Sequence, residues 1–468
     1  MKLTFHGAAQ TVTGSKHLIT TEGGLKVLLD CGLFQGMGAE GDELNRHFGF
    51  SPSDIDFLIL SHAHIDHSGL IPRLVKEGFR GQIYCTPATR DLCELMLLDS
   101  GSIQESDIQY INKKRKRKNQ SPFEALYTQE DAERSLKFFN TVEYQTWTEL
   151  NNEISFYLTD SGHVLGSGAV SLKIKEQNKE IRLFFSADIG RPGDQILRKP
   201  QPFDQADYII CESTYGDRLH EPILNAESHL LNTVIETCVV NKGKLIIPAF
   251  SLDRTQEVIY ALDRMEFEGK LPPIKVFVDS PLSVRTTRIV EKHIEYYNAD
   301  LKDYMTKGDH NPFFFKNLHF ITDVVESKAL NKLKEPCIII SASGMAEAGR
   351  IKHHIKNNIS NSKNTILIVG YCTPTSLGGR LAAGEKMVRI FGDEFDVIAR
   401  VDKIDSYSAH ADYNEMITYL KCQDFSKIKK LFLVHGDIEA MTSFKAKLQD
   451  AGIKDVYIPA KGETVELF

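Results

Sequence analysis

The densest group of metal-binding residue types in this chain is the segment His62-Ala63-His64-Ile65-Asp66-His67, directly after the apolar run 57–60. With 16 histidines among 468 residues, such a pattern would arise by chance in only about one in a thousand chains. Imidazole and carboxylate are the ligands that zinc prefers where cysteine is absent. On a loop leaving a strand, His62 and His64 can point toward one metal ion while Asp66 and His67 turn toward a second. The segment therefore predicts a pair of metal sites, with helix-capping or surface histidines as the alternative.

A site for two metals needs ligands from elsewhere in the chain, and three residues at predicted strand ends could supply them. His163 lies in DSGHVLGSGA, Asp188 closes the run LFFSAD, and His435 follows KLFLV. The glycines beside His163 would let the backbone come close to a metal ion or a substrate. A single histidine is more often structural than a ligand. Beside the 62–67 segment, however, we expect all three residues to bind metal.

These motifs together resemble the metallo-β-lactamase superfamily, whose pattern HxHxDH is present at 62–67. Asp30, in LLDCGLFQG, matches an early aspartate of that superfamily that supports the histidine loop rather than binding metal. The resemblance implies an α/β fold, an αββα sandwich, that holds two Zn²⁺ ions per chain. By the same resemblance, one zinc is bound by His62, His64 and His163 and the other by Asp66, His67 and His435, with Asp188 shared between them.

Three further segments resemble the β-CASP branch of the superfamily, which processes nucleic acids. Glu212 in CESTYGDR, His410 in YSAHADY and His435 in LVHGD match its additional motifs. The chain is similar to β-CASP ribonucleases related to the endonuclease subunit of the pre-mRNA 3′-end cleavage machinery. A histidine at the third motif is typical of the RNA-acting members, so the resemblance favours RNA over DNA.

The order of predicted elements agrees with an inserted domain. Short strands dominate the chain to about residue 188, whereas strands alternate with clear helices after about residue 215, which is typical of a parallel sheet. We therefore expect residues 1–212 to form the first part of a metallo-β-lactamase domain and 399–468 its last part. Residues 213–398 are expected to form an inserted, Rossmann-like β-CASP domain.

The resemblance implies a zinc-dependent ribonuclease that hydrolyses phosphodiester bonds of single-stranded RNA by metal-hydroxide attack. Asp66 and Asp188 would hold the catalytic metals. His410 would protonate the leaving 3′ oxygen, with Glu212 bound to its other ring nitrogen. Such attack leaves 5′-phosphate and 3′-hydroxyl ends, and endonuclease action with an additional 5′-exonuclease mode is expected. A packed interdomain histidine and a helix-capping glutamate are the structural alternatives for this pair.

The predicted inserted domain also contains candidate phosphate contacts. Ser343 and Gly344 in SASGM, with Ser376 and Arg380 in TSLGGRL, offer hydroxyls, backbone N–H groups and a fork-shaped cation. Arg254 in SLDRTQE is a similar candidate. Glycine-containing turns are also common in α/β domains that bind no ligand, so a purely structural role is the alternative.

The basic run KKRKRK at 113–118 stands out in a chain whose formal net charge is -7. Net negative charge argues against a nucleic-acid binder built on overall basicity, but phosphate contacts depend on where positive charge is concentrated. The run could guide RNA toward the cleft. A solvated loop or helix end explains it equally well.

Composition and the remaining motifs bear on the cellular setting. The eight cysteines form no CxxC pair, as expected of reduced thiols in a cytoplasmic protein. The amino-terminal residues contain no apolar run typical of a signal peptide, and no run is long enough for a membrane span, so we expect no membrane partner. The resemblance is compatible with a homodimer.

Three other functions remain open from the sequence alone. A hydrolase of small thioesters or lactones could use the same metal site, although Glu212 and His410 would then have no evident task. A DNA nuclease is the nearest neighbour in chemistry. A non-catalytic RNA-binding scaffold is the third alternative, which the complete set of expected ligands disfavours.

Overall fold

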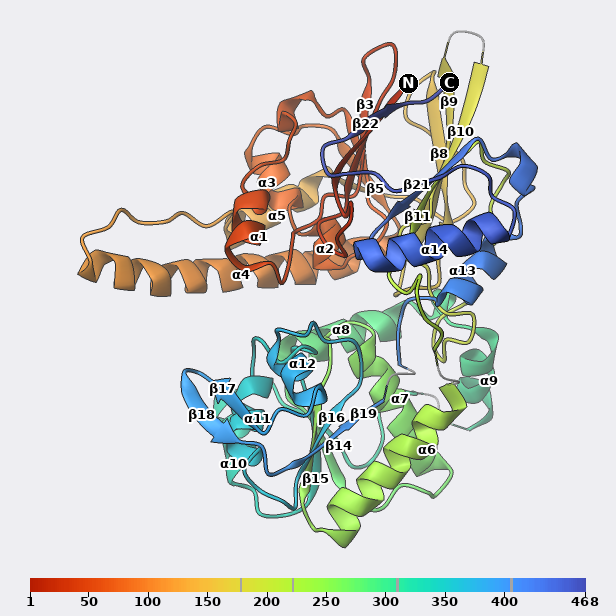
Figure 1. Ribbon diagram of the computed structural model, residues 1–468. Helices are drawn as coiled ribbons and strands as arrows, with labels where there is room; N and C mark the ends of the chain where they lie inside the picture. The colour runs from red at the N-terminus through yellow and green to blue at the C-terminus, as the bar shows by residue number, and fades with distance from the viewer. Residues whose placement is uncertain (177–178, 221–222, 309–310, 405–406) are drawn as a thin grey trace. The chain divides into compact units, whose positions relative to one another are not determined.

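The chain divides into two compact units in the computed structural model, which describes residues 1–176, 179–220, 223–308, 311–404 and 407–468 (Figure 1). The first unit comprises Met1–Asp194, Arg198–Leu219 and His410–Phe468, and the second comprises Gln195–Leu197 and His220–Ala409.

The observed division differs slightly from the expected boundaries at 212 and 399. Strand β19 (Arg400–Lys403) pairs in parallel with β16 (Thr365–Ile368). Residues 400–403 are therefore hydrogen-bonded to the second unit. The expected boundary at 399 had placed them in the last part of the first domain.

The first unit is built on two seven-stranded sheets. The first sheet has the spatial order β22 (Thr464–Glu466), β1 (Lys2–Gly7), β2 (Lys16–Thr20), β3 (Lys26–Leu29), β4 (Phe57–Ile59), β5 (Gln82–Cys85) and β6 (Phe139–Thr141). The second sheet has the order β21 (Val456–Tyr457), β20 (Lys430–Val434), β11 (Tyr208–Glu212), β10 (Lys179–Phe185), β9 (Gly168–Glu176), β8 (Ile154–Asp160) and β7 (Thr148–Glu149).

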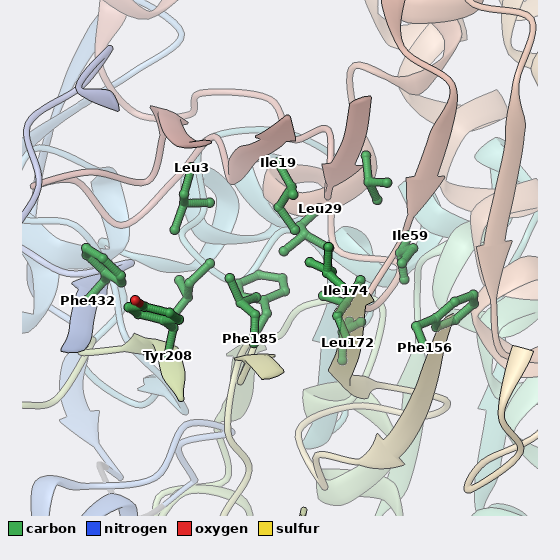
Figure 2. Close-up of a cluster of buried hydrophobic side chains, with 14 of the residues drawn as sticks. Leu3, Ile19, Leu29, Ile59, Phe156, Leu172, Ile174, Phe185, Tyr208 and Phe432 are labelled. Carbon is green, nitrogen blue, oxygen red and sulfur yellow. The ribbon is translucent and has the colours of Figure 1, made fainter. Parts of the chain in front are cut away.

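The inner faces of these two sheets share one apolar core. Leu3 and Leu29 of the first sheet belong to the same buried cluster as Phe185 and Phe432 of the second (Figure 2). Because side chains alternate along a strand, the neighbouring Phe184 points to the opposite face. It packs in a separate cluster with residues of α13 (Tyr413–Leu420) and α14 (Ile438–Asp450). The second sheet is therefore buried on both faces.

Helices cover the outer faces and complete the four layers. Figure 1 shows α3 (Ile71–Lys76) and α5 (Gln129–Ser135) beside the first sheet and α13 (Tyr413–Leu420) and α14 (Ile438–Asp450) beside the second. The expected αββα sandwich is confirmed. Within the described ranges, no helix has both the length and the apolar character that crossing a membrane requires. The remaining helices of this unit are α1 (Gly38–Asn45), α2 (Ile65–Ser68) and α4 (Pro87–Arg117).

The second unit contains a six-stranded sheet in which every described pairing is parallel. Its order is β14 (Leu318–Phe320), β13 (Lys275–Val278), β15 (Cys337–Ser341), β12 (Lys244–Pro248), β16 and β19. Its helices include α6 (Ile223–Val234), α7 (Arg254–Phe267), α8 (Pro281–Lys292), α9 (Ala299–Lys307), α10 (Val324–Lys332), α11 (Ile351–Asn358) and α12 (Leu377–Ala382). A parallel sheet connected through helices confirms the expected Rossmann-like insertion. A separate hairpin is formed by β17 (Met387–Ile390) and β18 (Asp393–Asp396).

One core residue of the first unit makes the fold sensitive to acid. His17 is fully buried, and neither ring nitrogen has a hydrogen-bond partner among the described residues. Its ring lies edge-on to Phe5 and Phe185, with centroid distances of 5.5 and 5.4 Å. Burial, reinforced by the positive charge of His67, lowers the pKa of His17 to about 3.

We predict that His17→Phe makes the protein less sensitive to acid. Below the ordinary histidine pKa of about 6.5, the unfolded chain binds a proton that the folded core excludes, so folding stability falls as the pH drops toward 3. At pH 5 the wild type should lose up to about 2 kcal/mol through this residue, and the variant should not. Denaturant unfolding at pH 7.5 and pH 5 measures the difference, with exposed His47→Gln as the control. Equal losses in wild type and His17→Phe would contradict the prediction.

Candidate active site

Parallel strand pairing brings three predicted site residues to one edge of the second sheet. Strand β11 runs parallel to both β10 and β20. Asp188 follows β10, Glu212 ends β11, and His435 follows β20. Because the carboxyl ends of adjacent parallel strands meet at the same edge, these residues become neighbours although they are far apart in the sequence.

A first group of donor atoms combines the 62–67 loop with the loop between β8 and β9. His64 Nδ1 lies 3.2 Å from His62 Nε2 and 3.3 Å from His163 Nε2. Asp188 Oδ2 lies 3.5 Å from His62 Nε2 and 3.4 Å from His163 Nε2. All four donor atoms lie within 4.8 Å of one another.

A second group of donor atoms lies directly beside the first. His67 Nε2 and His435 Nε2 are 3.3 Å apart, and His435 Nε2 is 3.5 Å from Asp66 Oδ2. Asp188 Oδ2 is also 3.3 Å from His67 Nε2. The Asp188 carboxylate therefore lies between the two groups.

This arrangement fits metal binding by a direct geometric test. Atoms at tetrahedral positions about 2.0–2.1 Å from a zinc ion are about 3.3 Å from one another, which is the spacing seen in both groups. The Oδ1 atom of Asp188 is buried and has no hydrogen-bond partner among the described residues. His435 Nδ1 lies 3.6 Å from this oxygen, and a buried carboxylate oxygen that accepts no hydrogen bond is costly unless a cation contacts it. The cluster therefore has the geometry of a metal site.

At His62, His64 and Asp66 the electrostatics favour the protonation states that bind metal. Burial, reinforced by His67, holds the pKa of His62 well below its usual value, and burial lowers the pKa of His64 to about 4. Burial alone would raise the pKa of Asp66, but His435 and His67 outweigh it and lower this pKa to about 2. Neutral imidazole and ionised carboxylate are the forms that coordinate metals.

Positive charge is stabilised at His67, which lies between two carboxylates. Burial opposes its protonation, yet the carboxylates of Asp188 and Asp30 raise the pKa of His67 well above its usual value. Two carboxylates on either side of this ring therefore favour a positive charge, which a divalent cation supplies.

Asp30 contacts the histidine loop through both of its carboxylate oxygens. Its Oδ2 lies 2.7 Å from His67 Nδ1 and accepts a hydrogen bond from Ser61 Oγ at 2.9 Å, while its Oδ1 accepts from Ser61 N at 2.8 Å. The backbone fits closely here, because a Cβ atom on Gly32 would lie 1.6 Å from the carbonyl oxygen of Asp66. Only glycine fits at that position.

His410 and Glu212 form a pair beside the metal cluster. His410 Nδ1 is 3.1 Å from Glu212 Oε1, which also accepts a hydrogen bond from Ile189 N at 2.6 Å. Glu212 is fully buried, whereas 20% of the His410 side chain is exposed. Burial opposes protonation of His410, but Glu212 outweighs it and raises the pKa of His410 to about 9. The ring of His410 lies 4.5 Å from that of His163.

Sequence reasoning missed residues that orient the site. Thr214 Oγ1 is 3.0 Å from His435 Nδ1, so the Nε2 atom of His435 faces Asp66. Ser167 Oγ accepts a hydrogen bond from His163 N at 3.1 Å. Their positions within CESTYGDR and SGHVLGS were the available signal, because each lies within four residues of a motif residue.

The candidate phosphate contacts lie in the second unit, at the carboxyl ends of three adjacent strands. Ser343 and Gly344 follow β15, Arg254 follows β12, and Ser376 with Arg380 follows β16. All four that have a side chain make internal contacts, and Ser343 Oγ lies 3.4 Å from Ala348 O. Ser376 Oγ caps α12 through Gly379 N at 3.0 Å, Arg380 pairs with Glu385 at 2.7 Å, and the buried Arg254 pairs with Glu257.

Comparison with protein families gives first the class of protein. Residues 14–215 match the model described as "Metallo-beta-lactamase superfamily". Residues 255–381 match "Beta-Casp domain", and residues 394–459 match "Zn-dependent metallo-hydrolase RNA specificity domain". Together with the αββα sandwich and the histidine–aspartate cluster, these matches define a metal-dependent hydrolase of the metallo-β-lactamase fold.

Comparison with individual proteins then gives the family. The chain is 32% identical to "Ribonuclease TTHA0252" of Thermus thermophilus, over 99% of this chain and 100% of that protein. It is 29% identical to "RNase J-like protein" of Methanocaldococcus jannaschii, over 98% of both chains. It is 28% identical to "Cleavage and polyadenylation specificity factor 73" of Drosophila melanogaster, over 95% of this chain and 61% of that protein. The chain belongs to the β-CASP family of metal-dependent nucleases.

We predict that Asp30→Asn weakens metal binding by about 10- to 100-fold. The amide removes the negative charge beside His67 and replaces an acceptor by a donor, so the ring loses its fixed orientation. Titration of the metal-free protein in competition with a chelator measures the affinity. Asp279→Asn is the matched control, because Asp279 is also buried and paired, with Arg350 and His354, but belongs to the second unit. Equal affinities in wild type and Asp30→Asn would contradict the role of Asp30.

Proposed function

We propose that this protein hydrolyses phosphodiester bonds of single-stranded RNA with two zinc ions, leaving 5′-phosphate and 3′-hydroxyl ends. The proposal rests above all on the position of Asp188, whose carboxylate lies within 3.5 Å of ring nitrogens from both donor groups. A carboxylate between two sets of ligands is what a pair of adjacent metal ions requires.

The residues that would hold the metals divide as the donor groups do. Asp188 would serve both ions, and when bound the zinc pair lowers the pKa of water to about 7, supplying a hydroxide nucleophile and neutralising charge on the phosphoryl oxygens. One ion would be held by His62, His64 and His163, and the other by Asp66, His67 and His435.

His410 is the proposed proton donor to the leaving 3′ oxygen. Glu212 Oε1 lies 3.1 Å from its Nδ1 atom, and we assign the transferred proton to its Nε2 atom. Glu212 is itself fixed by the backbone N–H groups of Ile189 and Thr214, so the imidazole ring is held in one orientation. A fixed acid beside a metal cluster fits a reaction in which an alkoxide leaves.

The choice of RNA rests on the family and on names rather than on the metal site. Relatives over nearly the full length include a protein named as a ribonuclease and one named "RNase J-like", and residues 394–459 match a model named for RNA specificity. The metal chemistry alone would also suit DNA, or a small thioester or lactone. Ser343, Gly344, Ser376, Arg380 and Arg254 remain the candidate phosphate contacts.

We predict that Asp188→Ala lowers kcat/KM on single-stranded RNA by at least about 10³-fold, because metal ions supply several kcal/mol of transition-state stabilisation. The substrates are an RNA oligonucleotide, the DNA of the same sequence and a glutathione thioester, and the product ends are mapped. The exposed Asp54→Ala variant is the control. Faster cleavage of DNA or of the thioester than of RNA would overturn the proposed substrate. Zinc-loaded wild type without any activity would favour a binding scaffold.

We predict that His410→Ala lowers kcat by about 10²–10⁴-fold while the metal content stays the same. Metal analysis is essential here, because His410 also lies within ligand distance of Asp188 and His435. Loss of one metal ion per chain in His410→Ala would identify His410 as a ligand and remove it as the proton donor.

A further inference from the structure

Helix α4 has one half that packs against the first unit and one half that does not. Its buried residues end at Gly101, although the helix continues to Arg117. Figure 1 shows the outer half extending beyond α1 and α5, with the following segment returning alongside it. A helix of 31 residues spans about 46 Å. Folding of the core does not explain why the outer half is present.

The carboxyl end of this helix carries many positive charges that are not paired with carboxylates of the described residues. Residues 113–118 are six consecutive cations, and within the described part of the chain none of them forms an ion pair with a carboxylate. One or two cations stabilise the carboxyl end of a helix through its dipole. Like charges one turn apart repel each other, so six exceed what helix stability can use.

Two exposed aromatic rings lie among these cations. Tyr110 is 62% exposed and Phe123 is 47% exposed. The ammonium group of Lys114 lies 4.3 Å from the Tyr110 ring, and the guanidinium of Arg115 lies 4.1 Å from the Phe123 ring. Exposed aromatic rings within a basic patch are the combination that binds single-stranded nucleic acid, since bases stack on the rings while cations contact phosphates.

The backbone of Phe123 is held by the side chain of Asn112. Asn112 donates from Nδ2 to Phe123 O at 2.9 Å and accepts from Phe123 N at its Oδ1 at 2.8 Å. Arg115 Nε donates to Ser121 O at 2.6 Å. These bonds fix the return segment against the helix and keep Phe123 exposed, so the ring is pre-positioned for a ligand.

We propose that residues 110–123, the α4 tip, form a second contact surface for single-stranded RNA, distant from the scissile phosphate. The class of ligand rests on the proposed function. An acidic protein segment would match the charge of the α4 tip but would not need the two aromatic rings.

The structure predicts how far the α4 tip lies from the chemistry. At the start of α4, Thr86 Oγ1 and Thr89 Oγ1 donate to Gly166 O at 2.7 and 2.9 Å, in the loop that carries His163. The 24 to 29 residues from Thr89 to the basic run correspond to about 36–44 Å. At about 3.4 Å per stacked nucleotide, this distance corresponds to roughly 10–13 nucleotides. A stacked strand shorter than this does not reach both places.

The test uses the zinc-loaded protein with poly(A) oligonucleotides of 6 and 30 nucleotides. The first variant replaces the five cations of the α4 tip other than Arg115 by glutamine, which leaves the hydrogen bond to Ser121 intact. We expect KM for the 30-mer to rise about 10-fold or more at low salt, with a weaker dependence of KM on salt concentration. The value of kcat, and both constants for the 6-mer, should not change. The control removes the same charge from the exposed lysines 302, 307, 328, 332 and 334.

A second variant tests the aromatic contribution. Phe123→Leu keeps an apolar side chain under Arg115 but removes the stacking surface, and it should raise KM for the 30-mer about fivefold or more. Tyr110→Leu should act in the same direction, and Tyr110→Phe should restore the wild-type value. If only the charge variant has an effect and polyglutamate competes as well as RNA, the tip binds acidic proteins and the proposal is wrong.

Failure of the α4 tip proposal is distinguishable from failure of the proposed function. Unchanged KM for the 30-mer in an enzyme that cleaves RNA overturns the tip proposal alone. If the wild type cleaves no RNA, binding of the labelled 30-mer is measured by gel shift. Weaker binding by the tip variants then supports the tip while the nuclease proposal fails, and equal binding overturns both.

Discussion

The structure depends on one electrostatic constraint, which is the crowding of buried polar groups around the carboxylate of Asp188. Ring nitrogens of His62, His163 and His67 lie within 3.5 Å of one oxygen of Asp188, and its other oxygen has no hydrogen-bond partner among the described residues. Burying several imidazole nitrogens and carboxylate oxygens together is costly unless cations lie between them. The fold has to hold these groups together before any metal arrives.

Two sheets and several strained loops meet this requirement. Asp30, Ala187 and His435 each have a positive φ, of 59, 49 and 53°, a conformation that side chains other than glycine adopt at a cost. Backbone hydrogen bonds hold two of them in place, from Asp30 N to Ile59 O at 3.1 Å and from His435 N to Ala8 O at 2.7 Å. The strain lies at the strand ends that carry the site, where the side chains of Asp30, Asp188 and His435 meet.

The sequence pattern was most informative where chemistry is local. HAHIDH predicted a metal site because its ligands are close in the chain, and apolar runs ending in Asp188 or His435 predicted strand ends. The resemblance to the β-CASP branch also predicted Glu212 and His410 as site residues. The sequence pattern was less informative about features that depend on packing between distant segments. It gave the basic run 113–118 both an RNA-guiding and a purely solvated interpretation, and it did not predict that residues 400–403 pair with β16.

The residue types available to bind metal, and their positions after apolar strands, can be read from the chain because both depend on neighbouring residues. The adjacency of β10, β11 and β20, which places Asp188 between the two donor groups, becomes visible only in the folded protein. The same holds for the burial of Arg254 against Glu257 and for the continuation of α4 past its last packed turn. Strand order and helix packing arise from contacts between distant segments, which no local spacing of residues encodes.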